Sequence, residues 1–348
     1  MRTRAFLVLA LLCAGLPCAA RDASWKLAAL VYPNDCRPAL TIPGAAIDVL
    51  VRGAEGESEI SGALFRREAQ YPLSLRAAGT QEPDGAKWFR ATVPKEAQAG
   101  AYSLEVQLRG RADRNSRSVF VFDKVPTEYA VAQVTDTHVG SWARSAAPML
   151  EAVTEQVNQA KPLLVLTTGD ITDGGKAEEY QTFLRMLNRF EAPTFVCAGN
   201  HDRHSRTLDS VYMDYCGEPS YFFDVGQDRF VACDMEFRWT DWQRHPQWLG
   251  VADALRGSPS TRWRILFSHR YEPGMSYHFQ RYLCEDRVSA FLSGHWHWDF
   301  VGEFSGGTKW VATAASVGGC WRMFRIGPEG VTVGPLQGPA TAEARGTP

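Results

Sequence analysis

Residues Leu163–Asp173 read Leu-Leu-Val-Leu-Thr-Thr-Gly-Asp-Ile-Thr-Asp, in which an apolar run of strand length, Leu163–Leu166, leads to a glycine and two carboxylates. Such a run predicts a buried strand that leaves its sheet at a polar turn. Similar runs lie at Tyr129–Val134 and Thr194–Ala198, and helix-like segments at Met149–Ala160 and Ala177–Phe190 separate the three. Because strands here alternate with helices, the sequence predicts a layered α/β domain.

The rest of this domain is expected to contain more strands than helices. Its strand candidates are Tyr221–Val225, Arg229–Ala232, Arg264–Phe267, Val288–Leu292, Phe300–Phe304, Lys309–Thr313 and Met323–Ile326. A segment rich in Trp and Arg, Glu236–Trp248, has no clear period, and we interpret it as a loop near the mouth of a site.

Polar side chains stand at the ends of five predicted strands. They are Asp136, His138, Asp170, Asp173, Asn200, His201, His269, His295 and His297. Ligands gather outside the carboxyl ends of strands in open α/β sheets, and five of the eight histidines of the chain fall in these turns. The sequence therefore predicts that the five turns form one site.

The spacing and chemistry of these residues indicate a metal site. Asp136 and His138 are two residues apart, as are His295 and His297, so in extended backbone each pair points to one side. The glycines before Asp170, Asn200 and His295 are expected where the chain leaves a strand with positive φ. Imidazole, carboxylate and amide ligands together suit divalent Mn, Fe or Zn.

The ordered motifs Asp-x-His, Gly-Asp-x-x-Asp, Gly-Asn-His-Asp, a lone His and Gly-His-x-His resemble the calcineurin-like metallophosphoesterases over roughly residues 129–326. The resemblance implies an α/β/β/α sandwich of two facing sheets with outer helices, and two divalent metal ions that share one carboxylate. Carried over by position, the first metal would be held by Asp136, His138, Asp170 and His297. The second would be held by Asp170, Asn200, His269 and His295.

The resemblance also implies a reaction, the hydrolysis of a phosphoester by a hydroxide that the two metals activate for in-line attack on phosphorus. His201 binds no metal in this scheme. It would pair with Asp173, stay protonated and assist the leaving oxygen. In the alternative interpretation, Asp173 only caps the following turn.

Within this family the chain most resembles the class III cyclic-nucleotide phosphodiesterases and their bacterial relatives, on Gly169–Gly175 and Thr308–Gly319. Purple acid phosphatases need a tyrosine where Asp173 stands and an aspartate where His138 stands, so we expect no iron–tyrosinate site. The expected substrate is a small phosphoester, either a monoester or a diester, with a nucleotide-like compound as one option. Arg270 could grip its phosphate, and Tyr271 or Trp296 could stack on a base.

Residues 25–124 are predicted to form a separate, small β-sandwich of immunoglobulin-like build. Its strand candidates are Lys26–Tyr32, Ala46–Arg52, Glu59–Phe65, Tyr71–Ala77, Trp88–Val93, Ala101–Leu108 and Arg117–Phe122. It holds no cluster of histidines with carboxylates, so we expect a packing or positioning role for it, with ligand binding as the alternative. The metallophosphoesterase-like domain would span residues 127–337, and residues 338–348 would be a disordered tail.

The first twenty residues resemble a secretory signal. Arg2 and Arg4 precede an apolar run and small residues, and cleavage is expected near Ala20. The run is short for a membrane span, although an uncleaved anchor is the alternative. We expect a periplasmic or secreted protein in an oxidising compartment, and the sequence cannot choose how its remaining cysteines pair.

The net charge of the chain is −2, whereas proteins that bind nucleic acid polymers are strongly basic, so we expect no such partner. No stable membrane span is expected after removal of the signal, and the oligomeric state cannot be predicted. Two other functions stay open from the sequence: an exported metal-binding sensor or binding protein with little turnover, and an adhesion or scaffold protein built on the N-terminal strands.

Overall fold

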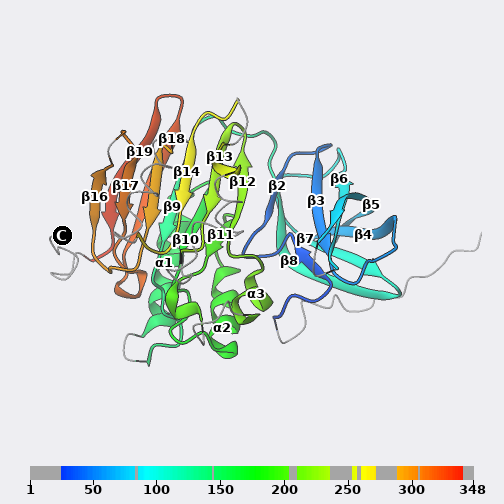
Figure 1. The fold of residues 1–348 in the computed structure, drawn as a ribbon, viewed down its shortest axis with the longest axis horizontal. Coiled ribbons are helices and arrows are strands. Elements are labelled where there is room, and N and C mark those ends of the chain that lie inside the picture. The colour runs from blue at the N-terminus through cyan, green and yellow to red at the C-terminus, as the bar shows by residue number, and fades with distance from the viewer. Residues whose placement is uncertain are drawn as a thin grey trace, which may run out of the picture.

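A computed structural model describes residues 25–82, 85–142, 145–203, 210–235, 253–256, 260–271, 288–304 and 306–339. The expected signal in residues 1–20 and the expected loop Glu236–Trp248 lie outside these ranges, as does the expected tail from residue 340 onward. An eight-stranded sheet lies beside a second part made of two further sheets and helices α1–α3 (Figure 1). Within the described ranges, no helix has the length and apolar character needed to cross a bilayer.

The N-terminal part is a sheet of alternating strands. Its members are β1 (Leu30–Tyr32), β2 (Ala39–Thr41), β3 (Ala46–Val51), β4 (Glu59–Arg66), β5 (Ala69–Gln81), β6 (Lys87–Thr92), β7 (Gly100–Leu108) and β8 (Arg111–Val121). Along β7, Tyr102, Leu104 and Val106 are buried in one apolar cluster, while the residues between them face outward. This period of two is what the sequence pattern predicted.

The eight strands pair in the order β1-β3-β6-β5-β4-β7-β8-β2. Contacts also join β1 to β8 and β2 to β3, so the sheet curls and encloses one large apolar core. All strands belong to one hydrogen-bonded sheet, so a sandwich of two separate sheets with immunoglobulin-like build stays a prediction. The short strand β2, which pairs parallel to β8, was missed because three residues carry no readable period.

The second part contains a five-stranded and a six-stranded sheet. The first has the order β11-β10-β9-β18-β19 and the second β12-β13-β14-β15-β17-β16. Strands β9 to β11 are parallel to one another, as are β13, β14, β15 and β17. The bounds are β9 (Tyr129–Val134), β10 (Leu164–Thr168), β11 (Thr194–Cys197), β12 (Tyr221–Val225), β13 (Asp228–Ala232), β14 (Arg264–Phe267), β15 (Ala290–Ser293), β16 (Phe300–Glu303), β17 (Lys309–Ala312), β18 (Trp321–Gly327) and β19 (Gly330–Gln337).

Helices α1 (Ala146–Ala160), α2 (Ala177–Leu187) and α3 (Ser210–Cys216) lie together beside the five-stranded sheet (Figure 1). Alternation along β9 sends Val131 into the core between the two sheets and Ala132 into the core under the helices. The outer face of the six-stranded sheet carries a third apolar cluster that includes Ala254 and Leu255. The described chain thus forms a mixed α/β fold with two facing sheets, and complete four-layer packing stays a prediction.

The segment before β2 anchors the N-terminal sheet to the second part. Cys36 is buried in the core under the helices, and its carbonyl accepts a hydrogen bond of 3.0 Å from the backbone N–H of Val196 in β11. The backbone N–H of Leu27 donates to the carbonyl of Asp214 in α3 at 2.6 Å. The two parts therefore share core residues, and the domain boundary between residues 124 and 127 stays a prediction.

Candidate metal centre

Nine polar side chains predicted from the sequence emerge from loops at the carboxyl ends of five parallel strands. The loop after β9 carries Asp136 and His138, and the loops after β10, β11, β14 and β15 carry the others. Backbone hydrogen bonds between neighbouring strands continue into these loops. The backbone N–H of Asp136 donates to the carbonyl of Gly169 at 3.0 Å, and the backbone N–H of His138 donates to the carbonyl of Asp170 at 3.0 Å. The sheets therefore fix the loops relative to one another.

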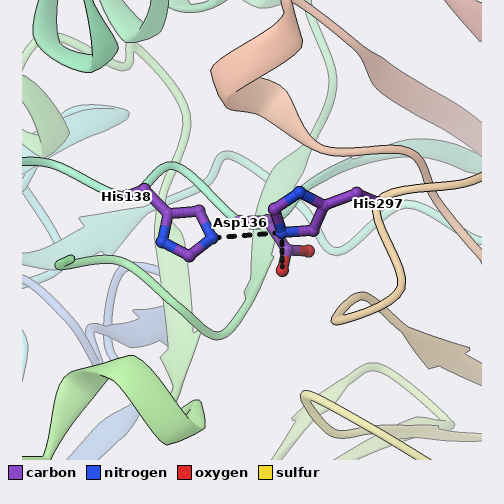
Figure 2. A group of neighbouring side chains, drawn as sticks. All are labelled: Asp136, His138 and His297. Atoms are coloured by element: carbon purple, nitrogen blue, oxygen red, sulfur yellow. Dashed lines mark hydrogen bonds and ion pairs between the residues drawn. The ribbon is translucent and has the colours of Figure 1, made fainter. Parts of the chain in front are cut away.

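The first group joins Asp136, His138 and His297 (Figure 2). The Nε2 atoms of His138 and His297 lie 3.1 Å apart, and Nε2 of His297 lies 3.2 Å from Oδ1 of Asp136. Asp170 approaches the same group, with its Oδ2 3.9 Å from Nε2 of His138. These are the four residues expected to share one metal ion.

The second group is centred on His269. Its Nε2 lies 3.1 Å from Oδ2 of Asp170, 3.1 Å from Oδ1 of Asn200 and 3.1 Å from Nδ1 of His295. Asp170 contributes to both groups, as expected for a shared carboxylate. All seven residues predicted as metal ligands thus lie in two adjoining groups.

The proton positions on His269 indicate a cation at the second group. Its Nδ1 lies 3.0 Å from the carbonyl of Thr168, which can only accept a hydrogen bond, so Nδ1 carries the ring proton of a neutral imidazole. Nε2 then presents a lone pair to Oδ2 of Asp170 and Oδ1 of Asn200, two acceptors that one added proton cannot both satisfy. Ligand atoms about 2.0–2.2 Å from a shared ion lie about 3–3.5 Å from one another, which matches these contacts.

The protonation states at the site also suit metal binding. The pKa of His295 is lowered to about 4, chiefly by burial and to a smaller extent by the neighbouring His269 and Arg270. Burial likewise lowers the pKa of His138 below its ordinary value. Burial on its own raises the pKa of Asp170, but its contacts with His269 and with the backbone N–H of His201 outweigh burial and hold that pKa well below its ordinary value. Neutral imidazoles and an ionised carboxylate are the forms that bind metals.

Five of the seven predicted ligands have left-handed backbone. The φ values are 50° for Asp136, 43° for His138, 49° for Asp170, 73° for His295 and 59° for His297. The argument from extended backbone was therefore wrong for both two-residue pairs. Asp136 and His138 still fall in the first group, whereas His295 and His297 fall in different groups. Non-glycine residues in this region are strained, and such strain concentrates at functional sites.

The three glycines that precede ligands have different roles. Gly169 has φ of +84°, as predicted, but Gly199 does not, with φ of −116°. Gly199 is required for space, because a Cβ there would lie 2.2 Å from Oδ1 of Asp170. Gly294 is similar, since a Cβ would lie 1.9 Å from Oγ1 of Thr135. The expectation of positive φ was thus wrong at Gly199 and Gly294.

His201 lies beside the first group, with its ring centroid 4.7 Å from that of His138. Its Nδ1 is 2.7 Å from the backbone carbonyl of Asp173, and the carboxylate of Asp173 instead lies 3.2 Å from Nδ1 of His138, outside hydrogen-bonding geometry. The carbonyl fixes a proton on Nδ1 of His201, which leaves Nε2 facing away from that bond. The predicted pairing through the Asp173 carboxylate therefore differs from the structure, where the backbone makes the contact.

His201 is also within reach of a metal. Its ring, His138 and Asp170 offer three ligand atoms within 4.8 Å of one another. The backbone N–H of His201 donates to Oδ1 of Asp170 at 2.8 Å, which fixes the loop next to the shared carboxylate. The geometry thus admits a ligand role for His201 beside the acid role expected from the sequence.

Asp202 is a supporting residue whose role the sequence did not reveal. It is fully buried, and its carboxylate accepts hydrogen bonds from the backbone N–H of Thr172 at 2.8 Å and of Gly199 at 2.7 Å. Burial and the charge of Asp170 raise the pKa of Asp202 to about 7. It joins the loops of Asp170 and Asn200, and its place directly after His201 was the available signal.

The candidates for substrate contact differ in exposure. Tyr271 is buried in the apolar cluster on the outer face of the six-stranded sheet, so it is a core residue. Trp296 is 44% exposed, and its ring centroid lies 5.1 Å from that of His295. Arg270 directly follows His269 in the chain, so its backbone lies beside the second group.

Comparison with known proteins agrees with this geometry. The sequence model of the calcineurin-like phosphoesterase family matches residues 129–299, which include every residue of both groups. A probable glycerophosphodiester phosphodiesterase of Arcobacter nitrofigilis is 38% identical over 93 residues, which are 24% of this chain and 34% of that protein. A probable cyclic nucleotide phosphodiesterase of Synechococcus sp. is 28% identical over 112 residues, 30% of this chain and 43% of that protein. The matches thus span less than half of either relative.

Among solved structures, the chain is similar to the purple acid phosphatase PPD1 of yellow lupin (Lupinus luteus), with 12% identity and a TM-score of 0.49 over 86% of this chain and 66% of that one. It is also similar to a dimetal phosphatase of Danio rerio, with 13% identity and a TM-score of 0.43 over 59% of this chain and 98% of that one. On the family match and the ordered site motifs, residues 129–299 belong to the calcineurin-like phosphoesterases.

Proposed function

We propose that this protein is a metal-dependent phosphoester hydrolase. The observation that carries the proposal is the convergence of lone-pair atoms on Nε2 of His269, with Asp170, Asn200 and His295 each 3.1 Å away. One ion would be held by Asp136, His138 and His297. The other ion would be held by Asn200, His269 and His295, and Asp170 would bind both ions. Two divalent ions supply Lewis acidity to phosphoryl oxygens and lower the pKa of bound water.

The protein side chains would orient the substrate and move one proton. His201 is exposed at the rim, and the Asp173 carbonyl holds its Nδ1 proton. Its Nε2 would donate a proton to the leaving oxygen and thereby stabilise the departing alcohol. The Arg270 guanidinium would bind a non-bridging phosphate oxygen through a charge-assisted hydrogen bond.

A small phosphodiester is the substrate class that the site supports best. Both curated relatives carry names of probable phosphodiesterases, one for glycerophosphodiesters and one for cyclic nucleotides. The exposed ring of Trp296 next to His295 offers a stacking surface for a planar group attached to phosphorus. Such a surface would favour a nucleotide or aryl ester over an aliphatic one.

The test is turnover with defined metals. The purified chain would be freed of metal, reloaded with Mn, Fe or Zn, and assayed with bis(p-nitrophenyl) phosphate and p-nitrophenyl phosphate. We expect metal-dependent hydrolysis, faster with the diester, and a loss of at least about 100-fold in Asp170→Asn. The matched control is Asp48→Asn, which removes an exposed carboxylate that pairs with Arg90 in the N-terminal sheet. Stoichiometric metal without turnover on any ester would favour the sensor instead.

We also propose that the protein is exported. We further propose that outer helices complete an α/β/β/α sandwich in the second part and that the N-terminal sheet is an immunoglobulin-like module. Arg2, Arg4 and the apolar run after them support removal of residues 1–20 and a periplasmic or secreted location. Buried Ala254 and Leu255 support outer helices on the six-stranded sheet, and the curled N-terminal sheet supports an immunoglobulin-like module. The mass of the protein from a periplasmic fraction tests export: a full-length, intracellular chain would contradict it.

A further inference from the structure

Cys36 occupies a hydrogen-bonded turn between β1 and β2. The side chain of Asn34 organises this turn, since its Oδ1 accepts hydrogen bonds from the backbone N–H groups of Cys36 and Arg37, both at 2.9 Å. Its Nδ2 donates to the carbonyl of Val31 at 2.8 Å and to the carbonyl of Cys216 at 3.3 Å. The turn is therefore attached to the end of α3 by a side chain that is itself buried.

Cys216 is the last residue of α3, and its sulfur meets that of Cys36. The two Sγ atoms lie 3.3 Å apart, although 180 positions separate the residues in the chain. The residues are 1% and 2% exposed and belong to the same apolar cluster under the helices. Cys197, by contrast, belongs to the cluster between the sheets, on the other face of β11.

We propose that Cys36 and Cys216 form a disulfide that joins the N-terminal sheet to α3. In this step the two thiols exchange with a disulfide-bearing oxidant. One S–S bond forms between Cys36 and Cys216, the S–S bond of the oxidant breaks, and the two protons and two electrons leave on its two thiols. The proposal is independent of hydrolase activity, and it requires that the chain folds where such an oxidant is present.

The bond would act on the helix that follows the loop of Asn200 and His201. In α3, the hydroxyl of Tyr212 donates to the carbonyl of Val196 at 3.1 Å, and the ring of Tyr215 stacks on that of Tyr180 at 5.0 Å. The hydroxyl of Tyr180 in turn donates to the carbonyl of Asp202. A cross-link at Cys216 therefore restrains the packing directly behind the metal loops. It also closes a long loop, which restricts the unfolded chain.

The direct test is a peptide map of the full chain, purified from an oxidising compartment without reductant. Thiols are first alkylated under denaturing conditions, and the protein is then digested. We expect the peptides of Cys36 and Cys216 as one linked species that separates only after reduction. Alkylation of both residues before reduction, or a link from either one to another cysteine, would overturn the proposal.

Thermal unfolding provides a second readout that needs no activity. We expect reductant to lower the midpoint of the wild-type chain by about 5 °C. Cys36→Ala, Cys216→Ala and the double variant should all be insensitive to reductant. Cys320→Ala is the matched control, since Cys320 is also buried but lies in a different cluster, and it should keep the wild-type sensitivity. Sensitivity that persists in the double variant would contradict the assignment.

Discussion

At the scale of single residues, His201 separates acid catalysis from metal binding. His201→Asn keeps a polar group but cannot donate a proton at neutral pH. If His201 is the acid, kcat should fall by about 100- to 10,000-fold while the metal content per chain stays as in the wild type. Elemental analysis and steady-state kinetics on the same preparation measure both quantities. A fall in metal content would instead make His201 a ligand, as its approach to His138 and Asp170 permits.

Trp296 gives a second residue-scale prediction, which concerns substrate preference. Trp296→Ala removes the exposed ring beside His295 and should raise KM for a cyclic nucleotide about 10-fold, because base stacking on an aromatic ring is lost. KM for a glycerophosphodiester should stay unchanged. Phe222→Ala removes another exposed ring, 46% exposed on β12, and serves as the control. An equal rise in KM for both esters would contradict a stacking role.

At the scale of the secondary structure elements, close packing between loops determines which residues the site tolerates. Gly294→Ala would place a Cβ 1.9 Å from Oγ1 of Thr135 and 2.4 Å from Oδ2 of Asp136. The loop after β15 must then move, so we expect lower metal content and a destabilisation of about 2–4 kcal/mol, measured by denaturant unfolding. Gly318→Ala is the control because no atom from elsewhere in the described structure lies within 4 Å of its added Cβ. Unchanged metal content in Gly294→Ala would refute this account of the loop.

The elements that carry the site were predictable from the sequence. The runs that end in the loops of Asp136, Asp170, Asn200 and His269 are apolar, and their bounds agree with β9, β10, β11 and β14 to within two residues. The signal is strong because parallel strands are buried on both faces. Helix α3 was missed because its seven residues are too few to show a helical period. Edge strand β19 was missed because Gly334 and Pro335 interrupt its pattern.

The backbone at the ligands could not be predicted in the same way. A non-glycine residue adopts positive φ only where its surroundings force it, and those surroundings come from loops far apart in the sequence. Two backbone hydrogen bonds that join the loop after β9 to the loop after β10 are one example of such surroundings. The hydrogen bond of 3.0 Å from the backbone N–H of His295 to Oδ2 of Asp136 is another. Motif order therefore predicted which residues meet, and tertiary contacts determine how they meet.

At the scale of the whole molecule, we expect the N-terminal sheet to stabilise the second part. Cys36 is buried in the core under the helices, and the Arg117 guanidinium donates to the carbonyl of Glu191 at 3.0 Å. A chain that begins at residue 125 should therefore expose apolar surface on α3. We expect its thermal midpoint to fall by at least about 5 °C relative to a chain that begins at residue 21. Equal midpoints and equal metal content for the two chains would contradict a supporting role.

The central claim is that seven side chains from five loops hold two cations that share one carboxylate. X-ray data collected on both sides of the absorption edge of the bound metal test it most directly. We predict two anomalous peaks per chain, both at about 2.0–2.2 Å from oxygen atoms of Asp170, one next to His138 and the other next to His269. A single peak, or two peaks of which either lies beyond bonding distance of Asp170, would contradict the account.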